Sequence, residues 1–142
     1  MKVGCKTLIV GEIYPKKGLE MNVVLWILQV LLGVMFVLAG VMHGFRQEQA
    51  KKQMTWMQAV PSGLLTFIGT AEILGGLGLV LPALTNIMPV LTPLAAVGLT
   101  IVMIMAAIFH FRRGENTAIV VNLVLGALAA FVAYGRFVLV PL

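Results

Sequence analysis

The sequence has few charged residues, and this scarcity excludes most classes of soluble protein. Only 11% of its 142 residues are charged, whereas 61% are hydrophobic and the mean hydropathy is +1.05. Soluble domains contain about 25% charged residues. The composition therefore predicts a membrane protein, and the length suits one small domain of four spanning helices.

Cysteine and histidine are almost absent as well. The single cysteine, Cys5, excludes an intrachain disulfide, a CxxC redox pair and a metal site built from cysteines. Two histidines, His43 and His110, are too few to build a haem or zinc site from this chain alone. Long internal repeats, linkers and low-complexity segments are also missing, which favours a single folded unit.

The formal net charge is +5, and its distribution argues against nucleic acid as a partner. The basic residues lie in the first 20 residues and at the ends of hydrophobic segments. In these places lysine and arginine orient a membrane protein and contact anionic headgroups. We therefore expect membrane lipids to be the partners of these residues.

Four hydrophobic segments are long enough to cross a bilayer, which takes about 20 residues per helix. Their expected bounds are 22–43, 62–82, 87–111 and 117–137. Short connections at 82–86 and 112–116 make successive helices antiparallel neighbours. The sequence thus predicts an all-α integral membrane protein of the cell membrane, with four transmembrane helices in an antiparallel up-down bundle.

Two segments lie outside these spans. Residues 1–20 form a lysine-rich tail whose apolar run, 8–10, is too short for a signal-peptide core. If Met21 is the natural start, this tail is an upstream extension, and the transmembrane domain is 21–142. We expect the tail to be dispensable for folding. The connection 44–61 carries four charged residues and then Trp56, a pattern typical of a short interfacial helix with Trp56 as its anchor.

The orientation in the membrane depends on the same start site. The first and third loops carry five basic residues, against Arg136 alone on the terminal side of a chain that starts at Met21. That asymmetry favours cytoplasmic loops. The four lysines of the tail make the two sides equal, and the bias then disappears.

Glu72 is the only charged residue in segment 62–82 and lies near its middle. Either end of the helix is roughly 15 Å away at the helical rise per residue. An ionisable side chain at this depth usually faces a bundle interior or a polar cavity. Gly69, Gly75 and Gly76 lie on the same face and leave room for a close helix or a ligand. The segment predicts a packed inner helix with a buried acid.

The first and last spans each carry one stripe of small and polar residues, spaced alternately by four and three positions. The stripes are Gln29, Gly33, Phe36, Gly40 and His43, and Asn122, Gly126, Ala129, Ala133 and Arg136. Both stripes are expected to face a common interior, with Gly33, Gly69, Gly76 and Gly126 at contacts between helices.

Antiparallel threading assigns a depth to each polar residue. His43, His110 and Asn122 fall near the side of the basic loops, and Gln29 and Arg136 fall toward the other side. A polar track from either histidine past Asn122 to Glu72 is one interpretation. In the other, Glu72 only joins helices through Asn122 or a backbone carbonyl. We expect His110 to be an interfacial histidine and Arg136 to be an interface anchor.

Five stretches resemble the DoxX-like membrane proteins: residues 36–40 (FVLAG), 67–82 (FIGTAEILGGLGLVLP), 91–99 (LTPLAAVGL), 110–115 (HFRRGE) and 122–137 (NLVLGALAAFVAYGRF). The resemblance covers about 21–137 and implies a four-helix membrane bundle. Many members have no established activity, and some are named as small subunits of a quinol-oxidising complex or as partners in membrane redox assemblies. Where the family often has a lysine after the first span's A-G-x-x, this chain has His43.

Three functions fit these features. The first is a non-enzymatic binding or accessory subunit, attached to a membrane oxidoreductase, whose cavity holds a lipid-like or quinone-like molecule. The second is a proton-coupled transporter like the small multidrug resistance proteins, which carry their membrane glutamate in the first span. The third is an enzyme, for which a lone acid and two peripheral histidines are thin support.

We favour the first of these functions. The sequence does not decide between a monomer and a homodimer. It predicts ligand-binding or proton-carrying residues, and no catalytic ones. They are Glu72, Asn122, His110, His43, Arg136 and Gln29.

Overall fold

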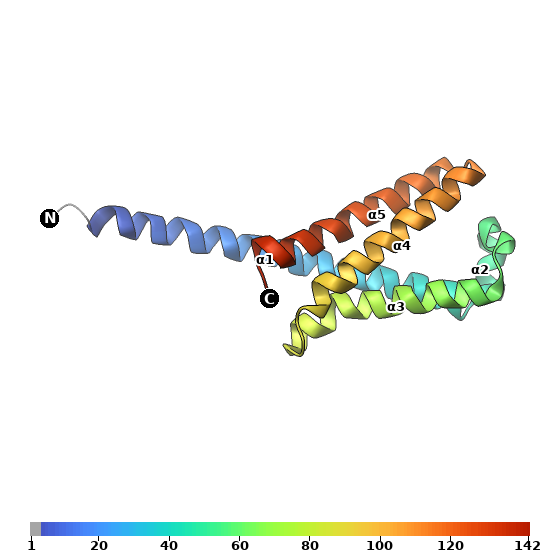
Figure 1. Ribbon diagram of the computed structural model, residues 1–142, viewed down its shortest axis with the longest axis horizontal. Helices are drawn as coiled ribbons and strands as arrows, with labels where there is room; N and C mark the ends of the chain where they lie inside the picture. Colours follow the sequence, from blue (N-terminus) through green and yellow to red (C-terminus); the bar gives the residue numbers. More distant parts are fainter. Residues whose placement is uncertain (1–3) are drawn as a thin grey trace.

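The computed structural model describes the backbone of residues 4–142 and the side chains from Lys17 onward. Throughout that range the regular structure is helical (Figure 1). The elements, in chain order, are α1 (Gly4–Gly44), α2 (Gln47–Gln53), the 3₁₀ helix η1 (Thr55–Ala59), α3 (Ser62–Thr85), α4 (Leu91–Arg113), α5 (Asn116–Tyr134) and the π-helix η2 (Gly135–Leu139).

Four of these segments are long and apolar enough to cross a membrane. They are Lys17–Gly44, Ser62–Thr85, Leu91–Arg113 and Asn116–Leu139. The prediction of an all-α protein with four membrane helices is therefore confirmed. In Figure 1 successive long helices run in opposite directions, and short turns join α3 to α4 and α4 to α5.

The four long helices form two hairpins, α1 with α3 and α4 with α5. The hairpins are joined mainly through α3 and α4, whereas α1 and α5 contact each other little. In Figure 1 the two hairpins lie further apart at the end near α2 than at the opposite end. This divergence positions the site described below.

Glycines bring α1 and α3 into backbone contact. A Cβ atom added to Gly69 would lie 2.5 Å from the Gly40 oxygen, and one added to Gly76 would lie 2.7 Å from the Gly33 oxygen. Such distances leave no room for any side chain at these crossings. Gly126 packs on α4, where an added Cβ would lie 3.2 Å from Met103 Cβ. The prediction that Gly33, Gly69, Gly76 and Gly126 lie at interhelical contacts is confirmed.

The helix ends differ from the predicted ends around the second turn. Helix α3 continues through Pro82 to Thr85, where the sequence predicts a turn, and it stops at Asn86, which is left-handed with φ 55°. Membrane helices tolerate proline better than soluble ones do, and a left-handed asparagine is a common helix stop. Helix α4 begins at Leu91, not at position 87.

Helix α1 begins at Gly4 and is continuous with the first span. It therefore includes most of the stretch that the sequence sets apart as a tail, and it extends beyond the other helices at its N-terminal end (Figure 1). Residues 8–10 lie outside the range whose side chains the structure describes. The expectation that residues 1–20 are dispensable stays a prediction.

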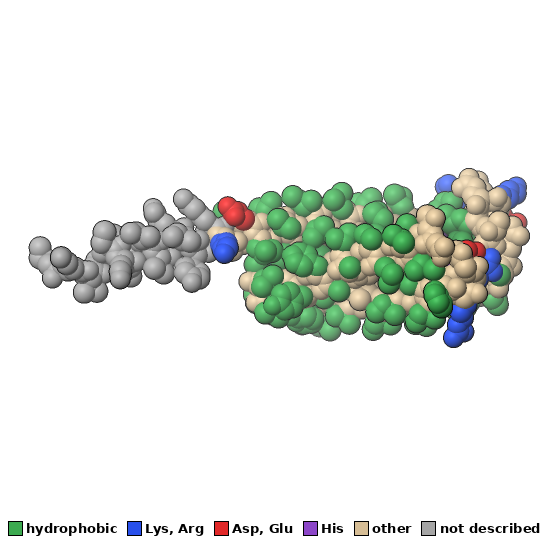
Figure 2. Space-filling view, turned by 90° about the horizontal axis from the view of Figure 1, so that it is seen from above, with side chains coloured by type: hydrophobic (Ala, Val, Ile, Leu, Met, Phe, Trp, Pro, Cys, Tyr) green, Lys and Arg blue, Asp and Glu red, His purple; other side chains and the backbone are tan. Residues whose placement is uncertain are grey.

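The molecule has an apolar middle and charged ends. Two clusters fill its interior: one at mid-bundle that includes Leu32, Leu79 and Val132, and one around Met57 and Leu65 beneath α2 and η1. Figure 2 shows hydrophobic side chains covering the middle of this face and charged ones gathered at the ends. This division matches a bilayer with water on both sides.

Candidate functional site

A cavity of about 620 Å³ lies between the two hairpins at the α2 end. Apolar side chains from α1, α4 and α5 form much of its wall, and polar side chains gather at one end. It is lined by Met35, Phe36, Ala39, His43, Gln53, Met54, Thr55, Trp56, Glu72, Met103, His110, Glu115, Asn116, Thr117, Ala118, Val121, Asn122 and Leu125.

The first polar feature of the cavity is a pair between His43 and Glu72. The Nδ1 atom of His43 lies 2.7 Å from Oε2 of Glu72, and the two side chains are 14% and 5% exposed. The glycine contacts between α1 and α3 allow the two side chains to meet. They bring the two backbones together within one turn of His43 and of Glu72. The sequence suggests Asn122 or a backbone carbonyl as the partner of Glu72, whereas in the structure the partner is His43.

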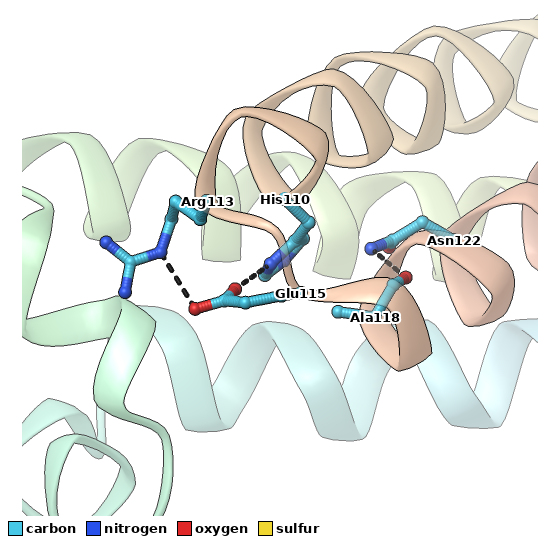
Figure 3. A network of polar contacts seen from close by, with 5 residues as sticks. All are labelled: His110, Arg113, Glu115, Ala118 and Asn122. Atoms are coloured by element: carbon cyan, nitrogen blue, oxygen red, sulfur yellow. Dashed lines mark hydrogen bonds and ion pairs between the residues drawn. The ribbon is translucent and has the colours of Figure 1, made fainter.

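The second feature is a pair between His110 and Glu115, in which Nδ1 lies 2.5 Å from Oε2 (Figure 3). Arg113 donates from Nε to the other carboxylate oxygen at 2.9 Å. Gly114, with φ 71°, turns the chain so that Glu115 folds back on the end of α4. The hydrogen bond from His110, followed by that from Arg113, lowers the pKa of the Glu115 carboxyl from its ordinary value.

This arrangement corrects the interpretation of His110 as an interfacial side chain among arginines. The residue is only 5% exposed, and its ring is bonded to a carboxylate. Glu115 was missed as a site residue because a charge in a short turn is usually a solvated one. The only signal for it in the sequence was its position five residues after a histidine that ends a span.

Trp56 connects the two pairs. Its ring centroid lies 5.2 Å from that of His43 and 5.4 Å from that of His110, in edge-to-face geometry on both sides. Neighbouring Met57 is fully buried and fixes η1 against the bundle. Trp56 is therefore half-buried and lines the cavity, and its role as an interface anchor stays a prediction.

Asn122 lines the cavity but does not join the network. Its Nδ2 atom donates to the Ala118 backbone oxygen at 2.8 Å, one turn earlier on α5 (Figure 3). The side-chain amide thereby finds a hydrogen-bond acceptor within its own helix, as asparagine often does when a backbone carbonyl is close. The suggested bond between Asn122 and Glu72 is not formed.

Gln29 and Arg136 belong to a separate cluster on the opposite side of the membrane. Arg136 donates to Gln29 Oε1 and to Asn22 Oδ1, both at 2.7 Å, and Gln29 donates to the Leu79 oxygen at 2.6 Å. Arg136 is only 2% exposed, so its interpretation as an interface anchor is wrong. The six predicted site residues thus divide into a cavity group and a group around Arg136.

The chemistry of the cavity follows from the two histidine–carboxylate pairs. Each ring bonds its carboxylate through Nδ1, which leaves Nε2 as the atom for another partner. An imidazole fixed in this way can donate or accept a proton at that atom. Among the side chains that the structure describes, no group of three or more His, Cys, Asp or Glu is arranged to hold a metal ion.

These features define a multi-pass membrane protein that carries a polar-ended cavity between two helical hairpins. The model of the DoxX-like family matches residues 27–132, which include most of all four spans. The chain therefore belongs to the DoxX-like family. No curated protein and no solved structure matches it.

Proposed function

We propose that this protein is a non-enzymatic binding or accessory subunit whose cavity holds a quinone-like or lipid-like molecule. One observation carries the proposal: an apolar cavity that ends at two histidine–carboxylate pairs. An amphipathic molecule matches both parts of this cavity. Some DoxX-like proteins are named as small subunits of a quinol-oxidising complex, and this supports a membrane oxidoreductase as the partner.

The size and position of the cavity suit such a molecule. Small-molecule sites usually measure about 300–1,000 Å³, and this one is about 620 Å³. Met35 of α1 and Val121 of α5 line it and are about half exposed on the bilayer-facing surface. Since α1 and α5 contact each other little, an apolar tail has a path between these helices into the bilayer.

The polar end suits a carbonyl or hydroxyl oxygen. The Nε2 atom of each histidine is available for a hydrogen bond, and Trp56 offers an aromatic surface between the two rings. A ring with oxygens on two sides would contact both histidines. We therefore assign the head of the ligand to the space beside His43, Trp56 and His110.

Two measurements test the proposal. A mass spectrum of lipids extracted from the purified protein should contain a bound quinone or a defined lipid. Titration with a short-chain quinone should quench the fluorescence of Trp56 in a Trp26→Phe background, where Trp56 is the single tryptophan. His110→Gln should weaken binding about tenfold, since one hydrogen bond to a fixed partner contributes about 1.4 kcal/mol.

Arg112→Gln is the matched control, because Arg112 is exposed at the same end and does not line the cavity. Its affinity should equal that of the unmodified protein. Equal affinity in His110→Gln, or a lipid extract without any retained molecule, would reject the assignment.

Proton-coupled transport is the second candidate, and the pair between His43 and Glu72 favours it. Ionisable side chains within spans mark proton relays in transporters, and here Glu72 is partnered by a histidine on the neighbouring helix. In liposomes, this function predicts substrate flux that follows an imposed pH gradient and stops in Glu72→Gln. Binding without flux would leave the accessory subunit as the function.

A further inference from the structure

Two buried side-chain atoms in the described part of the chain have no hydrogen-bond partner, Arg136 Nη2 and Thr92 Oγ1. The antiparallel register of α4 and α5, in which Gly126 packs on Met103, places them in about the same layer of the bundle. Ala96 and Val132 belong to one core cluster; Thr92 is one turn before Ala96 on α4, and Arg136 is one turn after Val132. Because α4 and α5 are neighbours that run in opposite directions, both atoms lie one turn further toward the end where α4 begins.

Among the side chains that the structure describes, Arg136 also lacks a counter-charge. Its bonded partners, Gln29 and Asn22, are neutral, and its guanidinium carbon lies 5.5 Å from the centroid of the Trp26 ring. None of the three ion pairs formed by described side chains includes it. A guanidinium that is only 2% exposed and unpaired is costly in a membrane protein, and it favours a bound anion.

The depth and the donors identify the class of anion. Arg136 lies three residues before the end of its span, or about 5 Å at the helical rise, which is close to the headgroup layer. Arginine and a hydroxyl both donate, so the partner must accept more than one hydrogen bond. A phosphate oxyanion does so, and arginine binds it in a fixed planar geometry. Lys17 and Glu20, the other charged side chains described at this end, are exposed to water.

We propose that Arg136 and Thr92 bind a phosphate oxyanion on the side of the membrane that holds the termini. Its source is either the headgroup of an anionic lipid or free phosphate. The site is independent of the cavity, because it lies at the opposite end of the bundle. One oxygen of the phosphate accepts from Nη2 of Arg136 and from the Thr92 hydroxyl, while Gln29 and Asn22 hold the rest of the guanidinium.

The test uses delipidated full-length protein in mild detergent and native mass spectrometry. Its three probes are phosphatidylglycerol, diacylglycerol with the same acyl chains, and inorganic phosphate. We expect one phosphatidylglycerol per chain, bound at least tenfold more tightly than diacylglycerol, because an arginine–phosphate bond is charge-assisted. Arg136→Gln and Thr92→Val should each reduce that preference, and Arg112→Gln at the opposite end should keep it.

The outcomes separate the sources. If inorganic phosphate protects against thermal unfolding as well as phosphatidylglycerol does, and Thr92→Val loses this protection, the oxyanion site is supported and its ligand is free phosphate. Preference for phosphatidylglycerol without an effect of inorganic phosphate assigns it to lipid. If Arg136→Gln does not fold, Thr92→Val still decides. No preference for either phosphate compound, or an unchanged preference in Thr92→Val, overturns the proposal.

Discussion

At the scale of single residues, the role of Glu72 depends on its hydrogen-bond partner as much as on its depth in the membrane. Its position at mid-span predicts an interior side chain, and the structure adds a histidine at 2.7 Å. The contact uses Nδ1 of His43 and leaves its Nε2 atom for a ligand. This separates a structural role from a functional one, since glutamine can replace the hydrogen bond but not the ionisation.

The Glu72→Gln variant should therefore keep its melting temperature and lose quinone affinity or proton-driven flux. Glu72→Leu should also unfold more easily, by about 1–3 kcal/mol, because His43 loses its buried partner. Thermal unfolding and quinone titration of both variants measure these effects. Glu48→Gln, at an exposed site on α2, is the control. Unchanged ligand binding in Glu72→Leu would remove Glu72 from the site.

Glu115 provides a test by pH. Its pKa is lowered from the ordinary value of 4.5, first by the hydrogen bond from His110. A carboxyl with a lowered pKa in the folded state stabilises the protein above its ordinary value, and this contribution disappears as the pH falls through the lowered one. The melting temperature of Glu115→Gln should thus lie below that of the unmodified protein at neutral pH.

This difference should persist down to about pH 4.5 and shrink only in more acidic solution. Melting curves of the two proteins at a series of pH values measure it, with Glu48→Gln as the reference for an unpaired glutamate. A difference that vanishes well above pH 4.5 would contradict the lowered pKa.

At the scale of elements, the contact of α1 with α3 depends on glycine. A Cβ at Gly69 would meet backbone atoms of Gly40 and Gly44 at 2.5 Å, and backbone cannot move aside as a side chain can. Gly69→Ala should therefore separate the helices and destabilise the protein by about 1–3 kcal/mol, the usual range for overpacking. Gly98→Ala is the matched control, because nothing lies within 4 Å of an added Cβ there.

The separation should also reach the cavity. His43 and Glu72 lie on the two helices that Gly69 holds together, so Gly69→Ala should weaken quinone binding as well as stability. Thermal unfolding and fluorescence titration measure the two effects on one sample. A Gly69→Ala protein as stable as Gly98→Ala would show that α1 and α3 are not held by this contact.

The sequence predicts the elements better than it predicts their partners. Hydropathy alone locates four spans, because about 20 apolar residues have few alternatives to a membrane helix. It misplaces the end of α3, since proline stops soluble helices more strictly than membrane helices. It finds the depth of Glu72 but not its partner. That pairing depends on how closely two glycine faces approach, and Trp56 and Glu115 belong to connections whose course the periodicity does not describe.

At the scale of the whole molecule, the two hairpins meet at one end and diverge at the other. The Arg136 cluster joins α1 to η2, which continues α5, at the end that holds the termini, while the cavity lies between the hairpins near α2. A bundle of this form can keep a site open to the bilayer without losing its core, because the mid-bundle cluster contains residues from all four long helices.

Helix α1 begins at Gly4, whereas its described span begins at Lys17, so most of the tail precedes that span. A protein that begins at Met21 should therefore insert, stay monodisperse and melt at the same temperature as the full chain. Size-exclusion chromatography and thermal unfolding measure this. Loss of insertion or of monodispersity would show that residues 1–20 contribute to the fold.

The same deletion tests the orientation. It removes four lysines from the terminal side and leaves Arg136 there against five basic residues in the first and third loops. The basic loops of the shortened protein should then lie in the cytoplasm, because lysine and arginine near the ends of spans set the direction of insertion. Protease accessibility of a tag placed after Leu142 reports which side the termini occupy, and a tag inserted at Gln49 on exposed α2 gives the complementary signal. The full chain, with equal charge on both sides, should show a weaker bias or a mixture of orientations. A shortened protein whose terminal tag is cytoplasmic would mean that features other than loop charge decide how this bundle inserts.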